Sequence, residues 1–77
     1  MIKNITILGA GESGFGAAML ASKKGYNVFV SDHSYIDDNV KLLFENNSIK
    51  FEENEHSIDI IKSSDLIIKS PGIPNSS

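Results

Sequence analysis

The glycine-rich stretch GAGESGFG, residues 9–16, constrains the fold more than any other part of this sequence. It follows the apolar, β-branched run ITIL and precedes a segment whose apolar residues recur at helical spacing. Gly9, Gly11 and Gly14 form the pattern G-x-G-x-x-G, which is typical of the turn between the first strand and first helix of nucleotide-binding α/β domains. The stretch therefore predicts a strand–turn–helix unit with an anion site at the start of the helix.

Strand-like and helix-like segments alternate along the rest of the chain. Apolar and β-branched residues predict strands over residues 2–8, 26–31, 49–53 and 65–70. Helical spacing predicts helices over residues 12–25, between Ser34 and the NNS at 46–48, and over residues 56–64. Because such alternation favours right-handed crossovers between parallel strands, we expect an α/β fold. The predicted architecture is a Rossmann-like parallel sheet in the order 3-2-1-4, flanked by helices.

Local signals mark the ends of these helices. Gly25 suits the position just past the first helix, where a positive φ is common. Ser34 precedes Asp37 by three residues, which is a weak version of the capping-box spacing for the second helix. Ser57 is the expected cap of the third helix.

The predicted strand order brings three loops together at the carboxyl ends of the strands, namely residues 9–14, 31–34 and 70–74. Ligands of such sheets bind there, at the switch point between the first and fourth strands. The chain stops after its fourth strand and a Pro-Gly turn, with no segment left to cover the edge of that strand. We therefore expect a piece of a longer protein, with the final strand of the domain missing.

Composition excludes several classes of function. The absence of cysteine rules out disulfides, zinc–cysteine sites and iron–sulfur clusters, and it fits a cytoplasmic protein. A net charge of −3 without a Lys/Arg cluster argues against a nucleic-acid partner. No apolar run approaches the roughly 20 residues of a membrane span. His33 and His56 lack metal-ligand spacing, and no catalytic Ser-His-Asp set can be assembled, so we expect neither a metal site nor a catalytic residue.

The glycine loop supplies the first group of candidate binding residues. Gly11 allows the backbone to approach a phosphate, and Gly14 allows the helix to pack closely on the first strand; Gly16 is expected to extend that packing. Ser13 offers a hydroxyl and an N–H group to a phosphate, although it could equally cap the helix. The carboxylate of Glu12 suits the helix dipole but would repel a diphosphate, so only its backbone is expected to face the ligand.

Asp32 ends the second strand, where dinucleotide-binding domains place an acid on the ribose hydroxyls. It could equally be a turn-forming residue before Ser34. His33 lies in the same loop and could touch a ligand, whereas His56 is expected at the surface near the start of the third helix. The remaining acids are interpreted as solvated, namely Asp37, Asp38, Glu52, Glu53 and Glu55.

The turn SPGIP, residues 70–74, follows the fourth strand. Pro71 favours an extended Ser70, and Gly72 can adopt a positive φ that brings the backbone close to a ligand at the switch point. Lys69 could contribute a positive charge to a phosphate, although strand alternation could also turn it toward solvent.

Taken together, GAGESGFGAAMLASKKGYNVFVSD and IKFEENEHSIDIIKSSDLIIKSPGIP resemble the N-terminal domain of the Mur ligases of peptidoglycan synthesis. Within that family, the sequence is most similar to the ligases that add D-glutamate to UDP-N-acetylmuramoyl-L-alanine. The resemblance covers nearly all 77 residues, and its most specific parts are GxGxSG, VSD and SPGIP. The ligases that add L-alanine share a glycine-rich opening but usually lack the SPG turn, and rank second.

The resemblance implies a division of labour among three domains. Residues 1–77 correspond to the first domain, which binds the UDP part of the substrate, and they lack the central domain, which binds ATP and Mg²⁺, and the C-terminal domain. In the family, ATP phosphorylates the substrate carboxylate, and the amine of D-glutamate then attacks the acyl phosphate. Because no G-x-x-x-x-G-K-[ST] loop occurs here, this part alone is expected to bind the UDP-sugar weakly and to catalyse nothing. The whole ligase is expected to be a cytoplasmic monomer.

By position, the resemblance assigns the diphosphate loop to Gly11, Glu12, Ser13 and Gly14, the uracil and ribose segment to Asp32, His33 and Ser34, and the closing turn to Ser70 and Gly72. Many members have Thr and Arg where this chain has His33 and Ser34, so the base contacts there differ. Asn54 stands where many members have Gly, and Asn tolerates a positive φ.

Two other functions fit the glycine loop and Asp32. One is an NAD(P)-binding domain of an oxidoreductase, and the other is a nucleotide-sensing regulatory domain. A domain that has lost its ligand is a third reading. The glycine loop alone does not distinguish among the nucleotides, and the SPGIP turn favours the ligase.

Overall fold

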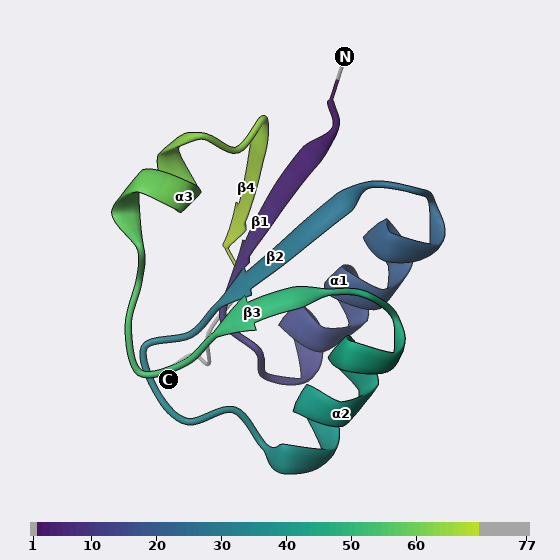
Figure 1. The fold of residues 1–77 in the computed structure, drawn as a ribbon, viewed down its shortest axis with the longest axis vertical. Coiled ribbons are helices and arrows are strands. Elements are labelled where there is room, and N and C mark those ends of the chain that lie inside the picture. The colour runs from purple at the N-terminus through teal and green to yellow at the C-terminus, as the bar shows by residue number, and fades with distance from the viewer. Residues whose placement is uncertain (1, 70–77) are drawn as a thin grey trace, which may run out of the picture.

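Four parallel strands form one sheet in the order β3-β2-β1-β4 (Figure 1). The computed structural model describes residues 2–69. Its strands are β1 Asn4–Leu8, β2 Asn27–Ser31, β3 Lys50–Glu52 and β4 Leu66–Lys69. Its helices are α1 Glu12–Lys23, α2 Asp38–Asn46 and α3 Ile58–Lys62. The predicted Rossmann-like order and the predicted alternation of elements are confirmed.

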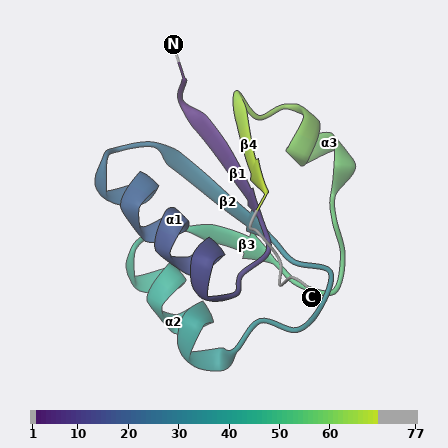
Figure 2. The ribbon, with the colours of Figure 1, turned by 180° about the vertical axis from the view of Figure 1, so that it is seen from behind.

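The helices lie on both faces of the sheet, as Figure 2 shows: α1 and α2 cover one face and α3 lies on the other. The core sits under α1 and α2, because every second residue of a strand points to that face. Its buried members are Ile5, Ile7, Ala18, Ala21, Val28, Val30, Ile36, Phe44 and Ile49. Small alanines on α1 let the helix approach β1 and β2 closely, while the Phe44 ring fills the wider space under α2.

The helix ends agree only in part with the sequence signals. Gly25 has a φ of +94° just past α1, as predicted. The cap of α2 is Asp37, whose carboxylate accepts a hydrogen bond from the Asn39 N–H at 2.9 Å. The capping-box role expected for Ser34 is therefore wrong, because Asp37 is nearer the helix and an equally good cap. Ser57 does cap α3 by position, but its hydroxyl is directed to a carboxylate described below.

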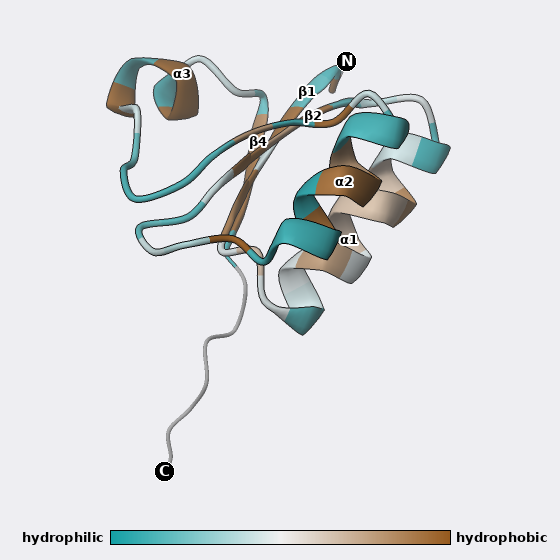
Figure 3. Ribbon diagram, turned by 60° about the horizontal axis from the view of Figure 1, so that its bottom comes forward, coloured by the Kyte–Doolittle hydropathy of each residue, from teal (hydrophilic) through white to brown (hydrophobic). Residues whose placement is uncertain are grey.

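Several of the exposed large apolar residues of the described chain lie on α3 and on the edge strand β4. Figure 3 shows apolar residues both along the strands and on α3. Ile58 and Ile60 on α3 and Leu66 and Ile67 on β4 are all exposed. Within residues 2–69, no helix has the length and apolar character needed to cross a membrane. The predicted turn at 70–74 lies outside the described residues.

Candidate functional site

The glycine loop is bound directly to the end of β2. The Gly9 N–H donates to the Ser31 carbonyl at 2.8 Å, and Gly9 has a φ of +103°. A Cβ added at Gly14 would lie 2.9 Å from the carbonyl carbon of Gly9 and even closer to its oxygen. Only glycine at position 14 therefore permits this packing of α1 against the turn, as the sequence predicted.

The other two glycines of the loop face open space. A Cβ at Gly11 or at Gly16 would meet no atom within 4 Å. The expectation that Gly16 extends the close packing is wrong, because two residues along a helix turn a side chain away from the face that Gly14 uses. Gly11 is the N-cap of α1, and the free space above it leaves the backbone open to a ligand.

The first turn of α1 presents its N–H groups to the same space. Glu12 and Ser13 are the first two residues of the helix, and both are exposed. Since the first N–H groups of a helix have no partner inside it, they form a site of positive potential. Ser13 lies inside the helix rather than at its N-cap, so the capping alternative for its hydroxyl is not what the structure shows.

Asp32 connects the glycine loop to the loop after β2. One carboxylate oxygen accepts the Ala10 N–H at 2.7 Å, and the other accepts the N–H and hydroxyl of Ser34 at 2.9 and 3.0 Å. Burial alone would raise the pKa of Asp32, but these hydrogen bonds outweigh it, so the pKa of Asp32 is lowered. Asp32 therefore does form the turn before Ser34. Its carboxylate accepts three hydrogen bonds there and keeps about one of its four acceptor positions free.

A loop that the sequence interpretation overlooked completes this end of the sheet. The loop between β3 and α3, residues 53–57, lies beside the loop after β2 (Figure 1). The Asn54 N–H donates to the Ser34 carbonyl at 3.1 Å, and the Glu55 N–H donates to the Asp32 carbonyl at 3.3 Å. The predicted strand order could have indicated this loop, because β2 and β3 are adjacent parallel strands and the loops after them begin at the same edge of the sheet.

Asn54 has a φ of +61°, so the expected tolerance of asparagine for this turn is confirmed. We expect Asn54→Ala to lower the free energy of unfolding by about 1 kcal/mol, because alanine is strained in the left-handed region. Asn54→Gly, the matched control, should unfold at the same urea concentration as the unmodified chain or a higher one. Equal midpoints for the alanine and glycine variants would contradict the described backbone.

Two acids expected to be solvated instead hold these loops. Glu53 accepts the Ile36 N–H at 2.9 Å and pairs with the Lys41 ammonium at 3.0 Å. Glu52 accepts the N–H and hydroxyl of Ser57 at 2.6 and 2.5 Å. The expectation is wrong for both, because each carboxylate satisfies N–H groups that the loops leave without a backbone partner.

The Ser31 side chain joins the same network. It is fully buried at the end of β2, and its hydroxyl lies 2.7 Å from a Glu52 carboxylate oxygen and 2.5 Å from Nδ1 of His56. His56 is exposed, as predicted, and its ring centroid lies 6.0 Å from that of His33, which is also exposed. The structure thus brings together the candidate His33 and an unassigned His56.

Lys69 is the last residue of β4 and pairs in register with Leu8, the last residue of β1. Its exposed side chain therefore starts beside the glycine loop. Ser70 and Gly72, the remaining candidates, lie outside the described residues. In the described part of the chain, no group of three or more acidic, histidine or cysteine side chains could hold a metal ion.

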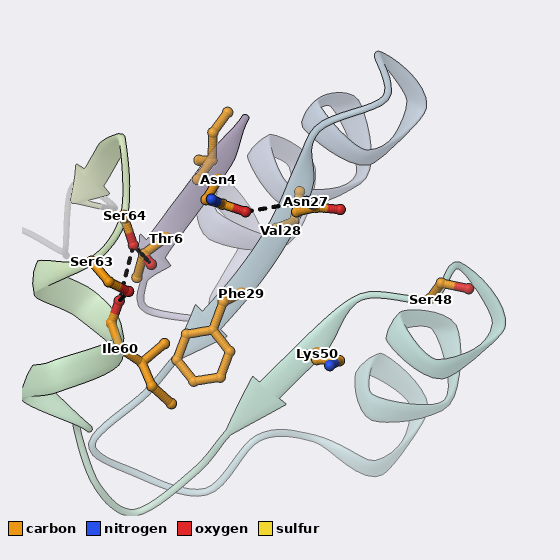
Figure 4. Close-up of a pocket in the computed structure, with 11 residues that line it drawn as sticks. Asn4, Thr6, Asn27, Val28, Phe29, Ser48, Lys50, Ile60, Ser63 and Ser64 are labelled. Carbon is orange, nitrogen blue, oxygen red and sulfur yellow. Dashed lines mark hydrogen bonds between the residues drawn. The ribbon is translucent and has the colours of Figure 1, made fainter. Parts of the chain in front are cut away.

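A hollow in the described part of the chain lies away from this crevice. Figure 4 shows it on the α3 side, with a volume of about 500 Å³. Thr6 and Phe29 form its floor, Lys50 lies at one end, and Ile60 and Ser64 line the α3 wall. The Asn27 amide donates to the Asn4 side-chain oxygen at 3.1 Å near the amino ends of the strands. Asn4 and Asn27 also line the hollow, so the hollow extends to the end of the sheet opposite the glycine loop.

Comparison with known proteins identifies relatives of this arrangement. The sequence model of a family described as the MurD N-terminal domain matches residues 4–77. The chain is 53% identical over 74 residues to the UDP-N-acetylmuramoylalanine–D-glutamate ligase of Bacteroides fragilis, covering 96% of this chain and 17% of the relative. It is 50% identical to the ligase of that name in Cytophaga hutchinsonii, covering 96% of this chain and 16% of the relative. The chain thus spans about a sixth of the length of these curated relatives.

Among solved structures, a malate dehydrogenase of Cryptosporidium parvum has a similar fold. The TM-score is 0.60 at 25% sequence identity, over 97% of this chain and 26% of the dehydrogenase. This similarity agrees with the Rossmann-like sheet order described above.

Proposed function

The chain belongs to the MurD N-terminal domain family, and on that premise we propose that residues 1–77 bind the UDP part of UDP-N-acetylmuramoyl-L-alanine. The observation that carries this proposal is the open backbone at Gly11. The turn before it is fixed by Gly9 and Gly14, and a phosphate can approach the N–H groups that start α1 without meeting a side chain.

In this proposal, each candidate residue has a place along the nucleotide. Gly11, Glu12, Ser13 and Gly14 surround the diphosphate, with Glu12 acting through its backbone N–H. Asp32, His33 and Ser34 lie along the ribose and uracil, and Ser70 and Gly72 close over the nucleotide. The position of Lys69 beside Leu8 supports a diphosphate at this edge, because its ammonium would offset part of the ligand charge.

We propose that the whole ligase adds D-glutamate to this substrate with ATP and Mg²⁺. The relatives' name supports the ligase reaction. ATP and Mg²⁺ are assigned to parts of the ligase outside these 77 residues, which contain no phosphate loop with the G-x-x-x-x-G-K-[ST] pattern. Residues 1–77 would then hold the substrate and catalyse nothing alone. The whole ligase is proposed to be a cytoplasmic monomer that acts in peptidoglycan synthesis.

Gly11→Ala tests the nucleotide site without disturbing the fold. A methyl group there meets no protein atom within 4 Å, but it occupies the space through which the phosphate approaches. We expect Gly11→Ala to weaken UDP binding about tenfold, equivalent to about 1.4 kcal/mol. Binding is measured from the backbone amide NMR shifts of residues 9–14 during a UDP titration.

Gly16→Ala is the matched control, since its methyl group also meets open space but lies on another side of α1. It should bind UDP as the unmodified chain does. Unchanged amide shifts at residues 9–14 in the unmodified chain would contradict the proposal, as would equal UDP affinities for the two alanine variants.

An NAD-binding domain is the competing function, because the malate dehydrogenase shares the fold. Asp32 does not separate the two functions, because UDP and NAD both carry a ribose with two adjacent hydroxyls. A parallel titration with NADH decides the matter. Saturable NADH binding without UDP binding would favour a dehydrogenase-like or nucleotide-sensing domain.

A further inference from the structure

The hydroxyl of Ser31 has one proton and three polar neighbours: a Glu52 carboxylate oxygen at 2.7 Å, the Glu55 carbonyl at 3.2 Å and Nδ1 of His56 at 2.5 Å. The Glu52 carboxylate also receives two hydrogen bonds from Ser57, which together with Ser31 keep the pKa of Glu52 lowered although burial opposes it. An ionised carboxylate can only accept a hydrogen bond. The Glu55 carbonyl can also only accept, so a Ser31 proton directed to His56 would leave two oxygen atoms facing the Ser31 lone pairs without a hydrogen between them. Ser31 therefore donates its proton toward these oxygens, of which Glu52 is the nearer.

This assignment fixes the tautomer of His56. Because the Ser31 proton is directed to Glu52, the Ser31 oxygen accepts a hydrogen bond from His56, so Nδ1 of His56 carries a hydrogen. A neutral imidazole with a hydrogen on Nδ1 has its lone pair on Nε2. His56 thus has one nitrogen bound to the fold and a second nitrogen available as a hydrogen-bond acceptor.

The position of His56 relates this acceptor to the nucleotide crevice. The hydrogen bonds from Asn54 to Ser34 and from Glu55 to Asp32 hold the loop of His56 against the loop after β2. The exposed His56 ring lies 6.0 Å, centroid to centroid, from the ring of His33. Since the proposed function places the ribose and uracil along Asp32 and His33, His56 lies beside the proposed position of the base.

We infer that His56 determines base specificity at this site: its Nε2 accepts the imide N–H of a uracil base. The inference rests on the proposed binding of a uridine nucleotide. Cytosine carries a lone pair in place of that imide hydrogen, so it would face the Nε2 lone pair without a proton between them. His56 therefore favours uridine over cytidine nucleotides, and Ser31 and Glu52 act as positioning residues for it.

A pair of substitutions separates the two nitrogens of His56. His56→Asn keeps an amide nitrogen near the Nδ1 position and removes the ligand-facing acceptor. His56→Gln places an amide near the Nε2 position and gives up the hydrogen bond to Ser31. Dissociation constants for UDP and CDP are measured by NMR titration of both variants, of the unmodified chain and of Asp59→Asn, an exposed control on α3.

The unmodified chain and Asp59→Asn should prefer UDP over CDP by about fivefold or more, corresponding to one hydrogen bond. His56→Asn should lose this preference mainly through weaker UDP binding, and His56→Gln should retain part of it. A separate ¹⁵N NMR spectrum of His56 should show the hydrogen on Nδ1 without any ligand.

The outcomes distinguish this inference from the proposed function. If UDP shifts the amides of residues 9–14 but His56→Asn keeps the UDP preference, the base-reading role is wrong and the nucleotide site stands. An equal loss of UDP and CDP affinity, or a hydrogen on Nε2 in the free chain, also overturns the role of His56. If UDP binds nowhere on the unmodified chain, the proposed function fails, and the inference fails with it.

Discussion

Gly14→Ala is expected to lower the free energy of unfolding by about 4 kcal/mol, which is at the upper end of single-residue effects. The added methyl group would overlap the backbone carbonyl of Gly9, which is held by the hydrogen bond from the Gly9 N–H to Ser31. A backbone carbonyl cannot rotate away as a flexible side chain can, so α1 must move from the sheet. In a domain of 77 residues, a loss of this size corresponds to a fall in melting temperature of roughly 20 °C.

Gly16→Ala, on the same helix, provides the matched control. Its methyl group meets no atom within 4 Å, and alanine loses less backbone entropy than glycine in a helix interior. We expect this variant to gain about 0.5 to 1 kcal/mol. Thermal and urea unfolding followed by circular dichroism measures both changes. Equal unfolding midpoints for the Gly14→Ala variant and the unmodified chain would show that α1 does not pack against Gly9 as described.

Gly14 and Gly16 also show which structural features a local sequence pattern can predict and which it cannot. The pattern G-x-G-x-x-G correctly predicts a strand, a turn and a helix, because hydrophobic periodicity and glycine spacing are local properties. The sheet order followed from the alternation of elements and the handedness of their crossovers. The same local pattern suggested a packing role for Gly16, although residues two apart on a helix point to different sides.

The site was less predictable than the fold, because its hydrogen bonds join distant segments. Glu52 meets Ser31, and Glu53 meets Ile36, across 21 and 17 residues of sequence. In the sequence, both acids end a short, half-exposed strand, where carboxylates are usually solvated. Only the unpartnered N–H groups and hydroxyls of the neighbouring loops, which the fold brings together, give these carboxylates their roles. Asp32 illustrates the same limit, since its position was predictable and its bond to Ala10 was not.

Asp32→Asn is expected to lower the free energy of unfolding by about 2 kcal/mol at neutral pH. The side chain of Asp32 is only 15% exposed, and its carboxylate accepts three hydrogen bonds from Ala10 and Ser34. An asparagine keeps one acceptor oxygen but turns its NH₂ group toward an N–H group, which leaves a donor unsatisfied. Asp59→Asn, an exposed change on α3, should stay within about 0.5 kcal/mol of the unmodified chain.

The pH dependence of this difference identifies the ionised carboxylate as its cause. Burial raises the pKa of Asp32, but the hydrogen bonds from Ala10 and Ser34 lower it by more than burial raises it. The pKa of Asp32 in the folded chain therefore lies below its pKa in the unfolded chain. The contribution of Asp32 is therefore complete above about pH 4, near the unfolded pKa, and is lost as the pH falls through the lower folded pKa. In urea unfolding between pH 2 and pH 6, the stability difference between the unmodified chain and Asp32→Asn should be constant from pH 5 upward and shrink below pH 4. Other carboxylates with lowered pKa values, such as Glu52 and Glu53, affect both proteins equally and cancel in this difference. A difference that stays the same down to pH 2 would mean that shape, rather than the charge of Asp32, holds the glycine loop to β2.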